Sequence, residues 1–431
     1  MENSIIVIGG GAAGLMAAHT LVKAGKKATI LEARNRTGGR IHTLYDASFF
    51  KKAELGAEFI HGDLPLTLQL LQEAGIPIQP AKLNMWRYHN GKFVQEEEHI
   101  PHWDLLMKKL DELNEDMPIA TFLDKYFAGE KYEQLKRSVK QFVAGYDTAD
   151  PANASAFALR AEWQNEDDDA QHRITGGYCA LISYLAEYVK AAGNEIKLNV
   201  VVKDIHWQAG QVQVITTDDK TYQASQLIIA LPLGILQLNE AEGGAIRFHP
   251  SLPQHAAAVR QIGFGSIIKI LLHFDAPLWE EKTNGEIKDS AFLFTDEAIP
   301  TWWTQGNGSP LLTGWLGGNK AYEWRDKSDE EIWQMALQTL SVLFKLDTET
   351  LKNRLIAWHV ANWTTDPYTR GSYAYDMTGS ENARQLLNNP VNNTLFFAGE
   401  YLYSGPAMGT VEAALNSGKA TANLLSKNCR T

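Results

Sequence analysis

Cysteine is scarce in this chain. Cys179 and Cys429 are the only two among 431 residues, which excludes a disulfide-dense scaffold and a zinc site built from cysteine ligands. Long apolar runs are also missing, since no stretch approaches the roughly 18 uninterrupted apolar residues of a membrane-spanning helix. The N-terminal Met-Glu-Asn leads into neither the basic nor the apolar region of a secretory leader. We therefore expect a soluble, cytoplasmic protein without a membrane partner.

An excess of positive charge is absent as well. The 40 lysine and arginine residues are outnumbered by 51 aspartate and glutamate residues, for a formal net charge of −11. An acidic chain is a poor partner for nucleic acid, so we expect none. The acidic run at 165–169 does not have the spacing of a calcium loop, and we assign no metal. The length predicts two or three domains with ample buried area.

Glycine is concentrated near the N-terminus. An apolar run, Ile5–Ile8, leads into Gly9-Gly10-Gly11-Ala12-Ala13-Gly14, and a helical pattern separates this cluster from a second apolar run, Ala28–Leu31, which ends at Glu32. This is the G-x-G-x-x-G motif between strand and helix, with an acid about twenty residues further on, and it predicts a dinucleotide site. The first glycine permits the tight turn, the second admits the pyrophosphate, and the third lets helix and strand pack closely. Glu32 is placed to accept a ribose hydroxyl.

The segment that follows Glu32 bears on the choice of cofactor. It contains Ala33, three arginines at Arg34, Arg36 and Arg40, and a second glycine pair that ends at Gly39. A nicotinamide site has no standing need for these residues. An extended FAD does, because its pyrophosphate and flavin need close approach of the backbone. An ordinary turn with solvated arginines is the alternative.

Strand and helix signals in the rest of the chain predict an α/β protein that is α+β overall. We expect helices at 65–72, 178–192, 252–262, 328–344 and 409–425 and a helical region at 99–145. Strands are expected at 195–199, 200–207, 211–217, 226–230, 265–274 and 395–398, with a hairpin at Asn90-Gly91 and a buried loop at 54–62. Nucleotide-binding elements thus lie at the beginning, middle and end of the chain, which predicts a discontinuous domain.

In their order along the chain, these motifs resemble those of the flavin-containing amine oxidases, which include monoamine oxidases, polyamine oxidases and flavin histone demethylases. The resemblance is carried by the opening motif and by EARNRTGGR from Glu32, ELGAEFIHG from Glu54, ITGGY from Ile174, LIIALPLGIL from Leu227, FGSIIKILLHF from Phe264, FFAGEYLYSG from Phe396 and TVEAALNSGKA from Thr410. It implies a discontinuous Rossmann-like FAD-binding domain, residues 1–77, 175–250 and 372–431. A mixed sheet-and-helix substrate-binding domain would comprise residues 78–174 and 251–371.

The resemblance also implies which residues contact the FAD. Val202 matches the residue that meets the adenine, Gly399-Glu400 the pair near the ribityl and phosphate chain, and Thr410-Val411 the start of the helix that faces the flavin. The full set is Gly9, Gly11, Ala13, Gly14, Glu32, Ala33, Arg34, Gly39, Arg40, Gly56, Ala57, Glu58, Val202, Trp363, Gly399, Glu400, Thr410 and Val411.

Lys269 is the strongest catalytic candidate. In the expected strand its neighbours on the same face are Ile267 and Leu271, because side chains two residues apart share a face. A lysine on an apolar face must reach solvent, form an ion pair or point into a wet cavity, and the residues alone leave these alternatives open. The resemblance favours a functional lysine, since the family carries one here that holds a water against flavin N5 and aids reoxidation by oxygen.

Trp363 and Tyr373 are further candidates by resemblance. The spacing from Trp363 to Ser372 matches the family's spacing between a tryptophan and the residue that links the flavin. Covalently flavinylated monoamine oxidases have a cysteine where this chain has Ser372, and a serine cannot form that thioether, so we expect non-covalent FAD. Tyr373 matches one wall of an aromatic cage that suits an amine. Core packing is the alternative for any single aromatic residue.

The chain departs from the family at the opposite wall. Residues 405–409, Gly-Pro-Ala-Met-Gly, occupy the region where many members place an aromatic residue, and the spacing of Tyr401 and Tyr403 does not match. Eight of the twelve tryptophans lie beyond residue 270. They include Trp302, Trp303 and Trp315. The sequence does not show which of them rebuild this wall.

The resemblance implies oxidative deamination of a small amine. A neutral amine would bind beside Tyr373, pass a hydride equivalent from its α-carbon to flavin N5, and leave as an imine that hydrolyses to an aldehyde. Oxygen would accept the electrons and become hydrogen peroxide. The partners are therefore a small amine and O2. The preferred amine, and the choice between monomer and homodimer, stay open.

Two other functions stay open at this point. L-amino-acid oxidases hold the substrate carboxylate with an arginine at the position of Glu58, which argues against that activity here. Glu58 either attracts a cationic tail, as in di- or polyamines, or is a structural hydrogen-bonded carboxylate. A flavoprotein that only carries electrons or serves as a scaffold is the remaining alternative, and Lys269 argues against it.

Overall fold

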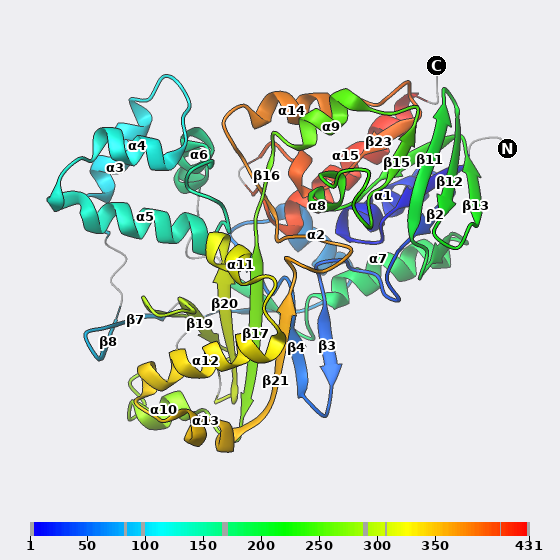
Figure 1. Ribbon diagram of the computed structural model, residues 1–431. Coiled ribbons are helices and arrows are strands. Elements are labelled where there is room, and N and C mark those ends of the chain that lie inside the picture. Colours follow the sequence, from blue (N-terminus) through cyan, green and yellow to red (C-terminus); the bar gives the residue numbers. More distant parts are fainter. Residues whose placement is uncertain are drawn as a thin grey trace.

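The computed structural model describes residues 4–81, 84–95, 100–165, 171–287, 292–306, 308–405 and 407–428. Two large sheets and a helical lobe make up the fold (Figure 1). The described parts of both chain ends lie at the end of the molecule that holds the first large sheet, and the lobe lies at the opposite end.

A five-stranded parallel sheet joins the beginning, the middle and the end of the chain. Its strands run in the order β10 (Glu195–Lys197), β2 (Ala28–Leu31), β1 (Ile5–Ile8), β14 (Gln226–Ile229) and β23 (Leu395–Phe397). Numbered along the chain, this is the 3-2-1-4-5 order of the Rossmann-like dinucleotide-binding fold. The predicted α/β class and discontinuous architecture are confirmed, whereas the domain boundaries stay a prediction.

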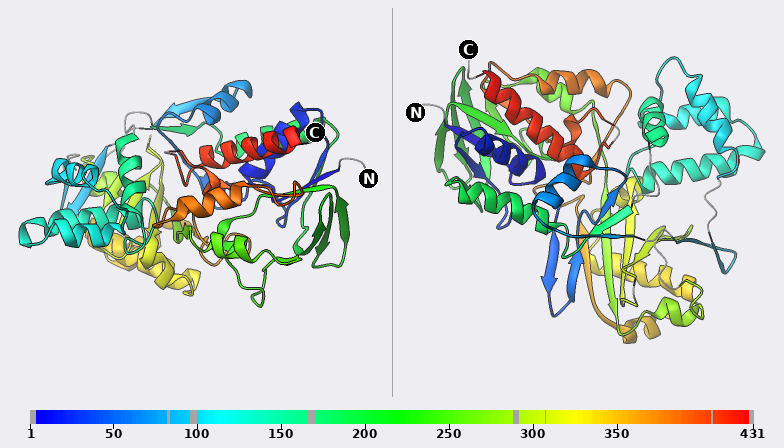
Figure 2. Two further views of the ribbon diagram at one scale, coloured as in Figure 1. Left: turned by 90° about the horizontal axis from the view of Figure 1, so that it is seen from above. Right: turned by 180° about the vertical axis from the view of Figure 1, so that it is seen from behind.

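Strand β1 is buried on both faces, as a central parallel strand is expected to be. Three helices cover one face (Figure 2), namely α1 (Ala12–Lys23), α7 (Cys179–Ala191) and α15 (Val411–Asn428). A four-stranded sheet covers the other, in the order β13 (Thr221–Ala224), β12 (Gln211–Thr216), β11 (Val202–Gln208) and β15 (Arg247–His249). Ile5 and Val7 pack toward the helices, and Ile6 and Ile8 pack toward the second sheet. The apolar run that opens the chain is thus explained by burial on two sides.

The second large sheet is mostly antiparallel and has seven strands. Their order is β21 (Leu355–Asn362), β17 (Ile267–Phe274), β20 (Leu311–Gly317), β19 (Thr301–Thr304), β18 (Phe292–Phe294), β7 (Met85–His89) and β8 (Lys92–Gln95). The even-numbered residues of β17 pack in the core with α12 (Asp329–Phe344). Ile267 and Leu271 face the other side, with Lys269 between them. The predicted alternation of this strand is confirmed.

Helix α12 begins where its sequence predicts. The side chain of Ser328 accepts a hydrogen bond from the backbone N–H of Glu331 at 3.2 Å, and the carboxylate of Glu331 accepts one from the N–H of Ser328 at 2.9 Å. This capping box satisfies two N–H groups that the first helical turn leaves unpaired. Three short helices lie nearby, α10 (Leu278–Lys282), α11 (Gly318–Trp324) and α13 (Thr348–Arg354).

The helical lobe has a small core of its own. It consists of α3 (Trp103–Asp111), α4 (Ile119–Tyr126), the 3₁₀ helix η1 (Glu130–Tyr132), α5 (Glu133–Gly145) and α6 (Ala156–Asn165). Leu106, Phe122 and Val139 are fully buried in its centre. The expected helical region at 99–145 is therefore divided, because Pro118 precedes α4 and Gly129, at φ 105°, turns the chain after it.

Shorter elements connect these parts. Small sheets are formed by β3 (Thr43–Asp46) with β4 (Phe50–Glu54), by β5 (Phe59–His61), β9 (Gln171–Ile174) and β6 (Ile78–Pro80), and by β16 (Gly263–Phe264) with β22 (Ala374–Tyr375). The remaining helices are α2 (Pro65–Glu73), α8 (Leu233–Leu236), α9 (Pro253–Val259), α14 (Ser380–Asn388) and η2 (Glu400–Leu402).

Most predicted elements are confirmed, and the missed elements include the strands β20 and β21 and the helix α14 as well as shorter strands. The hairpin at Asn90-Gly91 is present. The expected loop at 54–62 is wrong in part, because Phe59–His61 pairs with β9. Strand β13 was not predicted, since it is only four residues long and its apolar residues are limited to Tyr222 and Ala224. The acidic residues 166–169, Pro406 and Cys429 lie outside the described residues.

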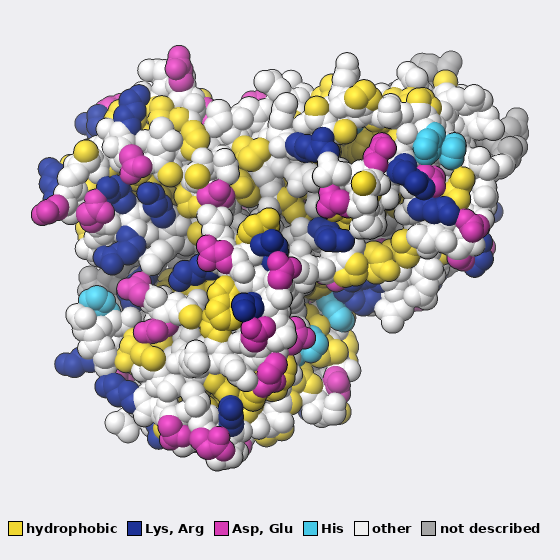
Figure 3. Space-filling view, in the orientation of Figure 1, with side chains coloured by type: hydrophobic (Ala, Val, Ile, Leu, Met, Phe, Trp, Pro, Cys, Tyr) yellow, Lys and Arg dark blue, Asp and Glu magenta, His cyan; other side chains and the backbone are white. Residues whose placement is uncertain are grey.

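Within the described residues, no helix is both long enough and apolar enough to cross a membrane. Residues of both charge signs are interspersed over the face shown in Figure 3. The excess of negative charge is therefore not gathered into one large patch on that face.

Gly418 tests how closely α15 packs on the start of α1. A Cβ at Gly418 would lie 2.1 Å from the carbonyl oxygen of Ala13. We expect Gly418→Ala to force the helices apart, at a cost of about 1–3 kcal/mol, and to weaken cofactor binding at the neighbouring glycine turn. Thermal unfolding of the cofactor-free protein and a cofactor titration measure the two effects.

Gly243→Ala is the matched control, because its added Cβ has open space and its φ lies outside the left-handed region. It should change neither property. An unchanged unfolding midpoint in Gly418→Ala would contradict the described packing.

Candidate active site

One continuous cavity of about 1340 Å³ runs from the N-terminal glycine turn to strand β17. Every cofactor and catalytic residue predicted from the sequence lines it, with the exception of Gly14. The lining set is Gly9, Gly11, Ala13, Glu32, Ala33, Arg34, Gly39, Arg40, Gly56, Ala57, Glu58, Val202, Lys269, Trp363, Tyr373, Gly399, Glu400, Thr410 and Val411. The fold thus gathers residues from three distant parts of the chain around one space, and their individual roles stay predictions.

The three glycines of the motif differ in what surrounds them. Gly9 has φ 103°, and a Cβ there would lie 2.3 Å from the carbonyl oxygen of Ala230. A Cβ at Gly14 would lie 1.9 Å from the carbonyl oxygen of Gly9, so Gly14 serves the packing of α1 on β1. A Cβ at Gly11 would meet no protein atom within 4 Å. The space beside Gly11 is therefore available to a ligand, as the dinucleotide motif requires.

The second glycine turn packs directly beside the first. The N–H of Gly38 donates to the carbonyl oxygen of Gly10 at 2.8 Å, and Glu32 accepts from the N–H groups of Gly10 at 2.6 Å and Arg34 at 2.8 Å. Only 6% of Glu32 is exposed. Its carboxylate therefore links the two turns by hydrogen bonds and lies in the cavity wall. This is the end of β2, where a ribose would be recognised.

The three arginines are not the solvated side chains of an ordinary turn. Arg34 forms a two-pronged ion pair with Asp366 and also donates to Thr369. Arg36 donates to backbone carbonyls of the glycine turn itself. Arg40 donates to Glu400 at 2.6 Å and to the carbonyl of Ser372. The interpretation of this segment as an ordinary turn with solvated arginines is wrong. Each guanidinium bonds within the turn or to a distant segment of the chain.

The cavity wall retains features that suit an extended dinucleotide. The Oε2 atom of Glu400 is buried and has no hydrogen-bond partner among the described residues. The last helix begins in the wall, where the hydroxyl of Thr410 accepts from the N–H of Ala413 at 3.2 Å. A helix N-terminus favours nearby negative charge. With the open space at Gly11, these features fit an FAD.

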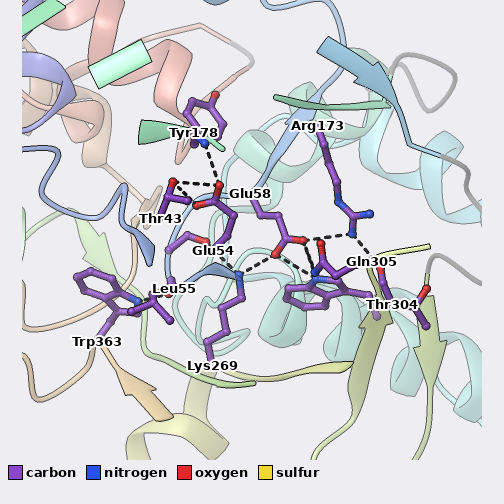
Figure 4. A network of polar contacts seen from close by, with 12 residues as sticks. Thr43, Glu54, Leu55, Glu58, Arg173, Tyr178, Lys269, Thr304, Gln305 and Trp363 are labelled. Carbon is purple, nitrogen blue, oxygen red and sulfur yellow. Dashed lines mark hydrogen bonds and ion pairs between the residues drawn. The ribbon is translucent and has the colours of Figure 1, made fainter. Parts of the chain in front are cut away.

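Lys269 lies at the far end of the cavity and is almost fully buried, with 1% of its surface exposed. Its ammonium donates to Glu58 at 2.8 Å and to the carbonyl oxygen of Gly56 at 3.3 Å (Figure 4). Trp315 stands directly opposite Lys269 in the antiparallel pairing of β20 with β17. Of the alternatives for this lysine, snorkelling to solvent is thus wrong, and it both pairs and lines the cavity.

Glu58 is ionised. Burial by itself would raise the pKa of Glu58, but the charges of Lys269 and Arg173 outweigh it and lower that pKa to about 2. Burial lowers the pKa of His61 more than its bond to Gln171 raises it, so His61 is neutral at neutral pH. The cluster therefore contains paired opposite charges beside a neutral imidazole.

Trp363 and Tyr373 both line the cavity. The indole N–H of Trp363 donates to the carbonyl oxygen of Leu55 at 2.7 Å, and the phenol of Tyr373 donates to the carbonyl oxygen of Tyr146. Burial, followed by the charge of Asp147, raises the pKa of Tyr373. Tyr373 is consequently a neutral, fixed wall and not a core residue.

Further aromatic residues line the cavity, and the sequence indicated only some of them. Trp303 and Trp315 line the cavity, whereas Trp302 is fully buried in the core with α12. Tyr401 is buried outside the cavity. The aromatic residues that sequence reasoning missed include Phe59, His61, Phe142, Tyr146 and Phe292. Phe59 and His61 stand in the ELGAEFIHG motif, and their alternation on β5 is the signal that pointed to them.

We call the end of the cavity that is lined by Lys269, Tyr373, Trp303, Trp315 and Phe59 the aromatic chamber. A cavity that joins such a chamber to a Rossmann-like sheet is typical of a dinucleotide-dependent oxidoreductase. The family model "Flavin containing amine oxidoreductase" matches residues 12–426. The chain belongs to this family. The predicted family, its flavin and its enzymatic class are thereby confirmed.

The relatives include both polyamine oxidases and histone demethylases. Polyamine oxidase 4 of Oryza sativa subsp. japonica is 30% identical, over 97% of this chain and 88% of its own length. Lysine-specific histone demethylase 2 of Homo sapiens is 28% identical over 93% of this chain, and the match spans only 50% of that protein.

Solved structures show the same fold. Cyclohexylamine oxidase from Brevibacterium oxydans IH-35A superposes with a TM-score of 0.81 and 20% identity over all of both chains. A putrescine oxidase bound to putrescine superposes with a TM-score of 0.79 and 21% identity over 98% of both chains.

Gly11→Val and Gly14→Ala should fail in different ways. Gly11 has φ −77° and ψ −175°, an extended conformation that valine adopts, so the cofactor-free protein should unfold at an unchanged temperature. Its flavin affinity should fall about 10- to 100-fold, since overpacking a ligand costs about 1–3 kcal/mol. Gly14→Ala should instead lower the unfolding temperature of the cofactor-free protein.

Calorimetry of the cofactor-free proteins and FAD titration separate these outcomes. Tight FAD binding by Gly11→Val would show that the cofactor does not approach this glycine.

Proposed function

We propose that this protein is an amine oxidase that holds FAD non-covalently. The observation that carries the proposal is the continuity of one cavity from the glycine turn to Lys269 and Tyr373. The glycine turn and the N-terminus of α1 would hold the phosphates of such a cofactor, and the residues around Lys269 and Tyr373 would surround its reactive ring.

The chemistry divides between cofactor and protein. When bound, the flavin would accept a hydride equivalent from the amine α-carbon and later pass two electrons to O2. The O2 also takes up two protons and becomes hydrogen peroxide. Tyr373 presents a neutral ring face to the amine, in either of its charge states. Trp303, Trp315 and Phe59 exclude water from the chamber. The released imine hydrolyses to an aldehyde.

We further propose that the substrates are di- or polyamines. The carboxylates of Asp147 and Glu162 line the chamber, and their charges act on Tyr373. They are placed to attract a second ammonium while the first amine reacts at the flavin. The relative from Oryza sativa named as a polyamine oxidase supports this substrate class.

The rival functions are less well supported. An L-amino-acid oxidase needs a free cation for the substrate carboxylate, whereas Glu58 stands at that position and pairs with the neighbouring cations Lys269 and Arg173. A pure electron carrier has no need for an enclosed aromatic chamber. Histone demethylation is also less favoured, since the chain spans about half of the demethylase relative's length.

Anaerobic addition of putrescine should bleach the flavin absorbance, and air should restore it with release of hydrogen peroxide. The rate of bleaching should rise with pH, because a protonated amine has no lone pair to assist loss of the hydride. Asp147→Asn should raise the KM for putrescine about tenfold, since a hydrogen bond to a charged group contributes about 1.5–3 kcal/mol. The KM for a monoamine such as benzylamine should change little.

A panel of monoamines, diamines, longer polyamines and amino acids completes this test. Bleaching by amino acids alone would favour the L-amino-acid oxidase, and no bleaching by any of them would contradict both oxidase functions. Equal effects of Asp147→Asn on diamines and monoamines would contradict the proposed substrate class alone.

A serine at position 372 predicts that the flavin is bound non-covalently. Its hydroxyl lies 2.5 Å from that of Thr148, and a serine offers no thiol for a flavin thioether. Acid precipitation of the yellow protein should therefore leave all of the flavin in the supernatant. Absorbance of the washed pellet checks this, and flavin that stays with the pellet would refute non-covalent binding.

A further inference from the structure

The carboxylate of Glu58 is enclosed by protein donors. Oε2 accepts from Lys269 at 2.8 Å, and Oε1 accepts from the amide of Gln305 at 2.9 Å (Figure 4). The indole N–H of Trp303 lies 3.1 Å from both oxygens, and Arg173 forms an ion pair at 3.2 Å. A carboxylate with four such donors has little capacity left for a substrate ammonium. The hypothesis that Glu58 attracts a cationic tail therefore loses its physical basis.

The same contacts fix the two groups that Glu58 shares with the cavity. Lys269 has three N–H donors, and Glu58 and the carbonyl oxygen of Gly56 take two of them. One donor is left for the cavity that Lys269 lines. The ring of Trp303 lies 5.1 Å from the ammonium nitrogen. Glu58 thus holds both the lysine and one aromatic wall from behind.

The charged groups around Lys269 show that Glu58 is the partner that balances the charge of its ammonium. Arg173 approaches from β9 and carries the same sign as Lys269, and His61 on β5 is kept neutral by burial, which lowers its pKa. Glu54 on β4 is bonded to Thr43 and to the backbone of Tyr178. Glu58 supplies the one ion pair that Lys269 makes within the described residues. Removal of the Glu58 charge would leave a buried ammonium beside a second cation.

We propose that Glu58 is a positioning residue whose ion pair holds Lys269 directed into the cavity, so that the part of Lys269 in the oxygen step depends on Glu58. This inference rests on the proposed oxidase function. A fixed positive charge near the flavin favours electron transfer to O2, because the reduced oxygen species are anionic until the two protons arrive. In this step O2 takes up two electrons and two protons to become hydrogen peroxide.

The test uses the flavin-loaded enzyme reduced by dithionite, so that it does not depend on any amine. Reoxidation after rapid mixing with O2 is followed by flavin absorbance for wild type, Glu58→Gln, Lys269→Met and the double variant, from pH 6 to pH 10. Unfolding temperatures of the same four proteins without flavin provide a readout that is independent of activity.

Wild type should reoxidise at a rate that changes little with pH. Glu58→Gln should be at least tenfold slower at high pH and should lose rate as pH rises, because an unpaired buried ammonium sheds its proton. Lys269→Met should be slow at every pH, and the double variant should equal Lys269→Met. In the flavin-free proteins, Glu58→Gln should lower the unfolding temperature more in the presence of Lys269 than in its absence.

Glu54→Gln is the matched control. It removes a neighbouring buried carboxylate that does not touch Lys269, and its reoxidation should stay within twofold of wild type across the pH range. If Glu58→Gln does not fold, Glu58→Asp keeps the charge one methylene further away and should give an intermediate rate.

Multiplicative effects of Glu58→Gln and Lys269→Met, or a pH-independent rate in Glu58→Gln, would overturn the inference. Amine bleaching would still stand in that case, so failure of this inference is distinct from failure of the proposed function.

Discussion

The burial of one lysine ammonium constrains the whole active-site region. Lys269 lies on an apolar strand face with 1% of its surface exposed, where an isolated charge is strongly disfavoured. Glu58 makes this position tolerable, and loss of one member of such a buried pair costs about 3–5 kcal/mol. That is a large share of the roughly 5–15 kcal/mol by which a folded protein is stable. The loop between β4 and β5 must therefore stay against β17, and this contact forms part of the cavity wall.

The glycine turn at one end of the cavity could be predicted from the sequence because its structural requirements are local. Gly9 needs a positive φ, and Gly14 needs the absence of a side chain beside Gly9; both needs arise within one strand, turn and helix. Glu32 follows in the next strand of the same unit. A short stretch of chain thus carries nearly all of the physical constraints, and the motif displays them directly.

The end of the cavity at Lys269 could be predicted only in part, because its contacts join residues that are remote in the chain. Glu58 and Lys269 are 211 residues apart, and Arg34 and Asp366 are 332 residues apart. No local pattern indicates such pairs. Lys269 itself could be found, since a lysine between Ile267 and Leu271 conflicts with the alternation of its strand.

Two adjacent tryptophans show which information the sequence lacks for predicting the cavity wall. Trp302 and Trp303 are adjacent on β19, so they must point to opposite faces. Trp302 enters the core, and Trp303 lines the cavity. Composition cannot show which of the two faces inward. The register of β19 with β20 decides it, and that register depends on the assembled sheet.

Two aromatic residues of the cavity wall are bonded to the end of one lobe helix. The phenol of Tyr373 donates to the carbonyl oxygen of Tyr146, and the indole of Trp315 donates to that of Gly145 at 2.7 Å. These carbonyls belong to the last turn of α5 and the residue after it, where helical carbonyls lack partners within the helix. The lobe therefore satisfies its own helix end with two aromatic side chains that line the cavity. A shift of α5 must move both side chains together, so substitutions in the lobe core are expected to act on substrate fit without touching the substrate.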